Sequence, residues 1–118
     1  MQKKFRLTRS EDFKRVRRSG KSYAHPLVVL LAQTSASSHP IHVGVTAGKS
    51  VGTAVQRNRA KRILREAMRP LLREASLPAD LDIALIARPA LVTATLDETR
   101  AALIQLLHRA QILPADES

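Results

Sequence analysis

The residues with the clearest chemistry in this 118-residue chain are the arginines and lysines of one stretch, RNRAKRILREAMR at positions 57–69. On a helical wheel, apolar side chains such as Leu64 and Met68 fall on one side and the cations fall on the other. Guanidinium groups match phosphate oxygens in a bidentate fork. The stretch therefore predicts a helix that packs on a core and presents a cationic face to a polyanion. The polar side of the wheel holds Asn58, Arg59, Lys61, Arg62, Arg65 and Arg69.

This cationic side opposes ordinary helix energetics. Lys61 and Arg65, like Arg65 and Arg69, are like-charge pairs four residues apart, and each pair costs about 0.2–0.5 kcal/mol. Cations in the first turns also oppose the helix macrodipole. Glu66 is the only acid within the stretch, and we expect it to pair with Arg62. Bound phosphates would reverse both penalties; the alternative is a solvated charged face, which is usually of mixed sign.

The connector before this helix has some features of a phosphate-binding loop. Gly44, Gly48, Lys49 and Ser50 lie between an apolar strand pattern and the basic helix. However, three residues separate the two glycines, whereas a Walker A motif needs four. No Asp ends the later apolar strand to hold magnesium, so nucleotide hydrolysis is disfavoured. We interpret the connector as a turn that presents Lys49 beside the basic helix.

The remaining polar residues form no catalytic pattern. The chain has no cysteine, which excludes disulfides, thiol catalysis and Cys-based zinc sites. Of the four histidines, only His39 and His42 are close in sequence, with no third ligand near them. The paired acids fall in the first turns of predicted helices or in the tail, where capping and solvation account for them. We therefore predict no catalytic residue and no metal site on this chain.

Positive charge is concentrated in the first part of the chain. Residues 1–73 hold 17 Lys and Arg against three acids, a net charge of +14, and residues 74–118 hold three against seven, a net of −4. A concentrated positive field on a small fold favours a nucleic-acid partner, with an anionic membrane surface as the less favoured one. The sequence has no apolar run of membrane-spanning length and no secretory signal, so we expect a cytoplasmic protein.

The hydrophobic pattern predicts one α+β domain over residues 1–118. We expect a helix over 9–18 with a Thr8 cap, a strand over 23–32, and an antiparallel partner strand over 41–47. The basic helix should begin near Thr53 and end or kink at Pro70, with one more turn to about 75. A buried central strand over 81–87 and a helix from a Thr95 capping box to about 110 follow. Residues 1–7 should form a basic arm and 113–118 an acidic flexible tail.

The basic helix and its surroundings resemble the protein subunit of bacterial ribonuclease P. The match includes the Arg57-Asn58-Arg59 motif, the basic residues that follow it, and the HVGVT segment at 42–46 before it. The SEDF segment at 10–13, the DIALIAR segment at 82–88 and the last helix at 96–109 also fit that family. The resemblance covers about residues 5–112.

This resemblance implies a fold and a function. The fold is a single-domain α/β sandwich of order α-β-β-(β)-α-β-α, whose basic helix crosses between two parallel strands. The crossover is left-handed, against the usual right-handed rule. The function is that of an RNA-binding subunit that assists a catalytic RNA in removing the 5′ leader from precursor tRNA. The hydrolysis and its Mg²⁺ ions belong to the RNA subunit, and no bound cofactor, membrane or protein partner is implied for this chain.

The resemblance also assigns residues to two surfaces, one for the RNA subunit and one for the leader. Phe13 matches an aromatic residue at the leader cleft, where stacking on a base and packing on the sheet can coexist. Other family aromatics are replaced by Arg17 and Leu31, and Ser50 stands where a lysine is common, so leader binding should rely more on charge. A basic cluster from Lys14 to Lys21 should flank the cleft. The RNA-subunit surface comprises Lys49, Arg57, Asn58, Arg59, Lys61, Arg62, Arg65 and Arg69, and the leader cleft comprises Phe13, Lys14, Arg17 and Arg18.

Two other functions would use the same features. A ribosomal or general RNA-binding protein without a processing role would present the same basic helix. An architectural DNA binder is less favoured because the sequence has no helix-turn-helix or dimer-zipper pattern. The two RNA functions differ in whether the protein stimulates 5′ cleavage of precursor tRNA.

Overall fold

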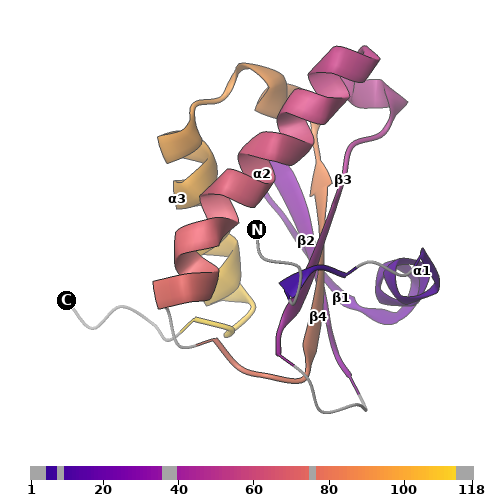
Figure 1. Ribbon diagram of the computed structural model, residues 1–118, viewed down its shortest axis with the longest axis vertical. Coiled ribbons are helices and arrows are strands. Elements are labelled where there is room, and N and C mark those ends of the chain that lie inside the picture. The colour runs from indigo at the N-terminus through magenta and orange to yellow at the C-terminus, as the bar shows by residue number, and fades with distance from the viewer. Residues whose placement is uncertain (1–4, 8–9, 36–39, 75–76, 114–118) are drawn as a thin grey trace.

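The computed structural model describes residues 5–7, 10–35, 40–74 and 77–113. These residues form three α-helices and a four-stranded sheet in the order α-β-β-β-α-β-α (Figure 1), which confirms the expected α+β class and adds the optional third early strand. The elements are α1 (Ser10–Ser19), β1 (Lys21–Ala24), β2 (Val28–Thr34), β3 (His42–Thr46), the 3-10 helix η2 (Lys49–Val51), α2 (Ala54–Glu74), β4 (Leu81–Ala87), the 3-10 helix η3 (Pro89–Thr93) and α3 (Leu96–Arg109).

The sheet has the strand order β1-β2-β4-β3. β1 and β2 form an antiparallel hairpin, so the prediction of one continuous strand over 23–32 is wrong. The chain reverses around Pro26, where His25 and Val28 exchange backbone hydrogen bonds of 3.0 and 3.2 Å. Proline has no N–H to donate to a strand ladder, which favours a turn at this position over a continuous strand.

β4 is the central strand of the sheet, as its apolar run predicted. It pairs antiparallel with β2 and parallel with β3, and its residues from Asp82 to Leu85 are buried. β4 thereby separates β3 from β2, so the predicted antiparallel pairing of 41–47 with the preceding strand is wrong. A helix connects β3 to β4, and a strand–helix–strand unit places its two strands in parallel.

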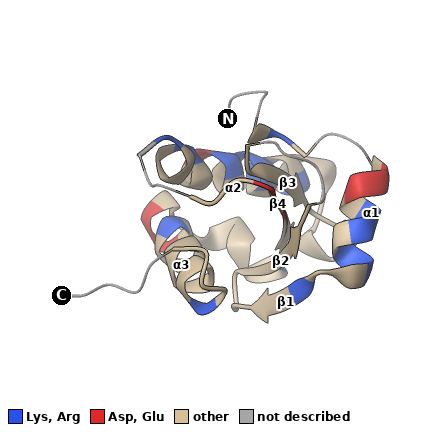
Figure 2. Ribbon diagram, turned by 90° about the horizontal axis from the view of Figure 1, so that it is seen from below, with Lys and Arg blue, Asp and Glu red and all other residues tan. Residues whose placement is uncertain are grey.

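α2 is the crossover between the parallel strands β3 and β4. α2 and α3 cover one side of the sheet and α1 lies on the other side (Figures 1 and 2). Seen from the side of α2 with both strands pointing up, β4 lies to the left of β3. The crossover is therefore left-handed, as the resemblance implied, although about 98% of such connections are right-handed.

Alternation along the strands divides the core between the two sides of the sheet. Leu30 and Leu85 belong to the larger cluster, which includes the buried residues of α2 and α3. Their sequence neighbours Leu31 and Ala84 belong to a smaller cluster with Val16 of α1. Each strand thus contributes apolar side chains to both layers, and the helices are fixed on opposite sides.

α2 continues through Pro70 to Glu74, which confirms the predicted extra turn beyond the proline and shows that the helix does not end at Pro70 itself. A proline removes the hydrogen bond to the carbonyl four residues earlier, which is that of Glu66. Arg100 of α3 supplies replacement donors. Its Nη2 lies 3.5 Å from the Glu66 carbonyl oxygen, and its Nε lies 3.4 Å from that of Ala67. Contact with α3 therefore compensates the break in the hydrogen-bond ladder.

α3 begins with the predicted capping box. The Glu98 carboxylate accepts from the Thr95 backbone N–H at 2.9 Å, and the Thr95 hydroxyl accepts from the Glu98 N–H at 3.1 Å. Hydrogen bonds from the Thr95 backbone, and then from its side chain, hold the pKa of Glu98 below its usual range. The predicted Thr8 cap, residues 1–4 of the arm and the tail after 113 lie outside the described residues.

Candidate nucleic-acid interface

The basic helix α2 begins with an uncharged cap. The Thr53 N–H donates to the Gln56 side-chain oxygen at 2.8 Å, and the Gln56 N–H donates to the Thr53 hydroxyl at 3.2 Å. Gly52 before it has φ 139°, and a Cβ there would lie 2.0 Å from the same Gln56 oxygen, so this cap requires glycine. The first turn of α2 contains no acid. The partial positive charge at the N-terminus of α2 is therefore available to an external anion.

α2 separates apolar from cationic side chains as the wheel predicted. Ala60, Leu64 and Met68 are fully buried in the larger core cluster. Basic residues follow the outer side of the helix along most of its length (Figure 2). We name the eight residues predicted to bind the RNA subunit the cationic face. Five of them are exposed, namely Lys49, Asn58, Arg59, Arg62 and Arg69. The other three are half-buried, namely Arg57, Lys61 and Arg65.

Three arginines of the cationic face have notable local surroundings. The Arg59 guanidinium donates to the Val92 carbonyl in η3, which anchors this side chain. Arg69 pairs with Glu66 at 3.3 Å, so the predicted pairing of Glu66 with Arg62 is wrong. The buried Nε of Arg57 has no hydrogen-bond partner among the described residues. A buried unsatisfied donor costs free energy, and a bound anion would offset that cost.

A cleft of about 350 Å³ lies between α1 and β3. Three of the four predicted leader-binding residues, Phe13, Lys14 and Arg17, line this cleft together. Arg18 is exposed on α1 but is not among the lining residues. The predicted basic cluster does not extend along the cleft to Lys21, because that residue lies on β1, at the opposite edge of the sheet.

Phe13 packs on the sheet and lines the cleft at the same time. Its ring lies over Gly44, where a Cβ would be 2.8 Å from Phe13 Cε2 and 3.2 Å from the Leu7 Cβ. The side chain also packs against the smaller core cluster, which includes Val16 and Leu31. The absence of a side chain at Gly44 therefore allows the ring to form a fixed wall of the cleft.

The edge of β3 joins the cleft to the cationic face. Arg6 forms a parallel bridge with Val43, and the neighbouring Leu7 N–H donates to the Val43 carbonyl at 3.0 Å. A second cavity at this edge, of about 220 Å³, is lined by Arg6, Phe13 and Arg65 among others. The basic residues of α1 and α2 thus lie on either side of one sheet edge (Figure 2). Sequence reasoning missed the place of Arg6 because it depends on pairing between the arm and β3.

A buried ion pair that we did not predict attaches α1 to the sheet. Arg15 donates to the Asp82 carboxylate and to the side-chain oxygen of Gln33. Asp82 is 2% exposed, and the Nδ1 of His42 lies 3.5 Å from its Oδ1. The available signal was a single Asp inside the apolar run at 81–87, since a buried carboxylate requires a partner. The pair helps to hold α1, and therefore one wall of the cleft, in place.

The described residues contain no group of three or more His, Cys, Asp or Glu placed to hold a metal ion. His42 faces Asp82, and His39 lies outside the described residues. In the same part of the chain, none of the helices combines the length and apolar character that crossing a membrane requires.

The fold and these surfaces define a small α+β protein that presents a polyanion-binding face on a crossover helix. The family model described as Ribonuclease P matches residues 1–111. The chain belongs to this family. It is 39% identical to the ribonuclease P protein component of Herpetosiphon aurantiacus, over 95% of this chain and 89% of that protein. It is 44% identical to that of Dehalococcoides mccartyi, over 92% of this chain and 86% of that protein.

Solved structures of ribonuclease P proteins have the same fold. The protein from Staphylococcus aureus matches with a TM-score of 0.79 and 26% identity, over 92% of this chain and 97% of that chain. The protein from Thermotoga maritima matches with a TM-score of 0.72 and 28% identity, over 88% and 96%. The family and the fold that the resemblance implied are confirmed.

Proposed function

We propose that this chain acts in ribonuclease P by binding the catalytic RNA subunit through its cationic face and the 5′ leader through the cleft beside α1. The family supports the overall role. As a ribonuclease P protein component, the chain is part of the ribonucleoprotein endonuclease that matures the 5′ ends of tRNA. The observation that carries the residue-level proposal is the joining of both basic surfaces at the β3 edge.

The cationic face is suited to the phosphates of a folded RNA. Its arginines provide bidentate donors, and the first turn of α2 carries no acid that would repel a phosphate. Arg62 is exposed, and Arg59 is anchored beside it by the Val92 carbonyl. Such contacts are largely independent of base sequence and strongly dependent on salt.

The cleft is suited to a single strand. Phe13 presents an aromatic ring on which a base can stack, while Lys14 and Arg17 provide charge for the backbone. Since Phe13 is the only aromatic residue among the described residues that line this cleft, we expect charge to contribute at least as much as stacking. Arg17→Ala should then weaken precursor binding at least as much as Phe13→Leu. A much larger effect of Phe13→Leu would contradict this division of roles.

The chemical step belongs, in this proposal, to the RNA subunit. The described part of the chain has no donor set that fits Mg²⁺. We expect Mg²⁺ to act with the RNA, and the holoenzyme to work in the cytoplasm on newly made precursor tRNA. The protein contributes affinity for the substrate and positions it. This contribution should be largest at low salt, where few cations are available to screen the repulsion between the RNA subunit and the precursor tRNA.

Reconstitution tests this function. The full chain is mixed with a ribonuclease P RNA at low Mg²⁺, and 5′ cleavage of a precursor tRNA is measured, with mature tRNA as the binding control. We expect the protein to stimulate cleavage and the complex to bind precursor more tightly than mature tRNA. Absence of stimulation together with equal affinity for both tRNAs would contradict the proposal and favour a general RNA-binding protein.

A further inference from the structure

A further cavity, of about 360 Å³, lies between β1 and the turn that follows α3. β1 is the sheet edge opposite β3, and none of the described residues that line this cavity belongs to the cleft or to the cationic face. Its volume falls within the range of about 300–1,000 Å³ that is usual for small-ligand sites. The proposed function assigns no role to it.

The local backbone explains why this space is open. Lys21 and Tyr23 are two residues apart on β1, so their side chains point to the same side of the sheet, which is the side of α3. The residue paired with Lys21 is Ala32, whose small side chain leaves room above the strand. α3 ends at Arg109, and the chain turns away through Gln111, which has φ 60°. The end of the helix thus leaves this edge of the sheet uncovered.

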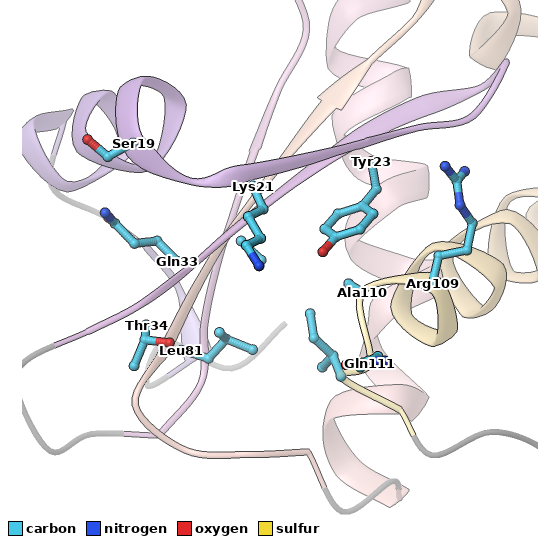
Figure 3. A pocket seen from close by; sticks show the side chains of 11 residues that line it. Ser19, Lys21, Tyr23, Gln33, Thr34, Leu81, Arg109, Ala110 and Gln111 are labelled. Atoms are coloured by element: carbon cyan, nitrogen blue, oxygen red, sulfur yellow. The ribbon is translucent and has the colours of Figure 1, made fainter.

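The side chains around the cavity form a cationic, hydrogen-bonding environment. Figure 3 shows the Lys21 ammonium and the Tyr23 hydroxyl pointing into the same space, with Thr34 and Gln111 at its sides. The Arg109 side chain borders the cavity, but its guanidinium points away from it (Figure 3), and its Nη1 donates to the Ala24 carbonyl at 2.8 Å, which fixes β1 against α3. None of the described residues that line the cavity is acidic. Such a site favours an anion with several acceptor oxygens.

We propose that this cavity is a third binding site of the chain, and that it takes the phosphate group of a nucleotide. Lys21 forms a charge-assisted hydrogen bond to the phosphate, and the Tyr23 hydroxyl donates a second one. The remaining volume, beside Thr34 and Gln111, accommodates the sugar or base. The phosphate has two sources with the same chemistry, a free nucleotide or one nucleotide of the partner RNA.

Nuclear magnetic resonance of the full chain tests the site itself, with adenosine monophosphate and inorganic phosphate as probes. We expect saturable shifts of the amides of Lys21, Tyr23 and Gln111. Lys21→Ala should weaken this binding about tenfold, as expected for loss of a charge-assisted hydrogen bond. Tyr23→Phe keeps the ring, and so preserves the fold, while it removes one donor; it should weaken binding several-fold. Arg88→Ala removes an exposed charge outside the cavity and should leave binding unchanged.

Binding of the RNA subunit by the same variants distinguishes the two sources. If Lys21→Ala weakens RNA binding and Arg88→Ala does not, the phosphate is one of the RNA. If Lys21→Ala leaves RNA binding unchanged but abolishes the amide shifts that adenosine monophosphate causes, the site takes a free nucleotide. The proposal is overturned if the probes shift only amides of α2, or if Lys21→Ala and Arg88→Ala reduce binding equally. These outcomes are independent of cleavage stimulation, which tests the proposed function separately.

Discussion

Replacing Arg15 with methionine tests how α1 is held on the sheet. Methionine keeps an unbranched side chain of similar reach but removes the guanidinium that donates to Asp82 and Gln33. The Asp82 carboxylate then stays buried in β4, with His42 3.5 Å from its Oδ1. A buried carboxylate that loses a charged partner keeps its desolvation cost without the compensating attraction.

The size of the effect follows from the burial of the two partners. Removing one partner of a buried pair costs about 3–5 kcal/mol, whereas exposed pairs contribute about 0–1 kcal/mol. The Asp82 side chain is 3% exposed and that of Arg15 is 34% exposed, so water screens one partner only. We expect Arg15→Met to lower the free energy of unfolding by an intermediate amount, about 2–3 kcal/mol. The variant should remain folded, since domains of this size have about 5–15 kcal/mol of stability.

Urea unfolding followed by circular dichroism measures this loss. Arg88→Met is the matched control, because Arg88 is exposed and its replacement should change stability by less than about 0.5 kcal/mol. Asp82→Asn, added to Arg15→Met, should recover part of the loss, because a neutral amide is less costly to bury than a carboxylate. Equal, small effects of Arg15→Met and Arg88→Met would refute the reasoning, as would a double variant less stable than Arg15→Met alone.

Three further predictions concern other parts of the molecule. Gly44→Ala places a Cβ 2.8 Å from the Phe13 ring and should cost about 1–3 kcal/mol of stability; in binding assays it should weaken the complex with precursor tRNA but not with mature tRNA. Arg100→Leu should cost about 1 kcal/mol, and in urea unfolding Pro70→Ala should remove most of that cost by restoring the N–H of the helix ladder. The lowered pKa of Glu98 means that this group stabilises the fold above its ordinary pKa and ceases to do so as the pH falls through its lowered value. Glu98→Gln should therefore lose less stability than the parent protein on acidification, which pH-dependent urea unfolding would reveal, and an identical pH dependence would contradict the capping role.

Elements that depend on neighbouring residues were predictable from the sequence. The strand over 81–87 and the capping box at Thr95 match the observed bounds, because an apolar run and a cap are local signals. The division of α2 into a buried and a cationic side also follows from its periodicity alone. For the cleft, the sequence resemblance predicted Phe13, Lys14 and Arg17, which the fold brings together.

Features that depend on distant partners could not be predicted in the same way. Pro70 is tolerated because Arg100, on another helix, contacts the carbonyl that the proline leaves free. Arg15 and Asp82 are 67 residues apart, and neither side chain indicates its partner. Likewise, β3 pairs with a strand that follows it across a helix, so the short loop between the second and third strands suggested the wrong neighbour. In each case tertiary contact decided between locally acceptable alternatives.

The central claim is that the cationic face binds the RNA subunit. Its most direct test is the salt dependence of the affinity between the protein and that RNA. We predict that the Arg62→Gln and Arg65→Gln double variant binds more weakly, with a slope of log affinity against log salt that is flatter by up to about 2. The control Arg88→Gln should keep the slope of the parent protein. A double variant with unchanged affinity and unchanged slope would contradict the account, because the cationic face would then be merely solvated.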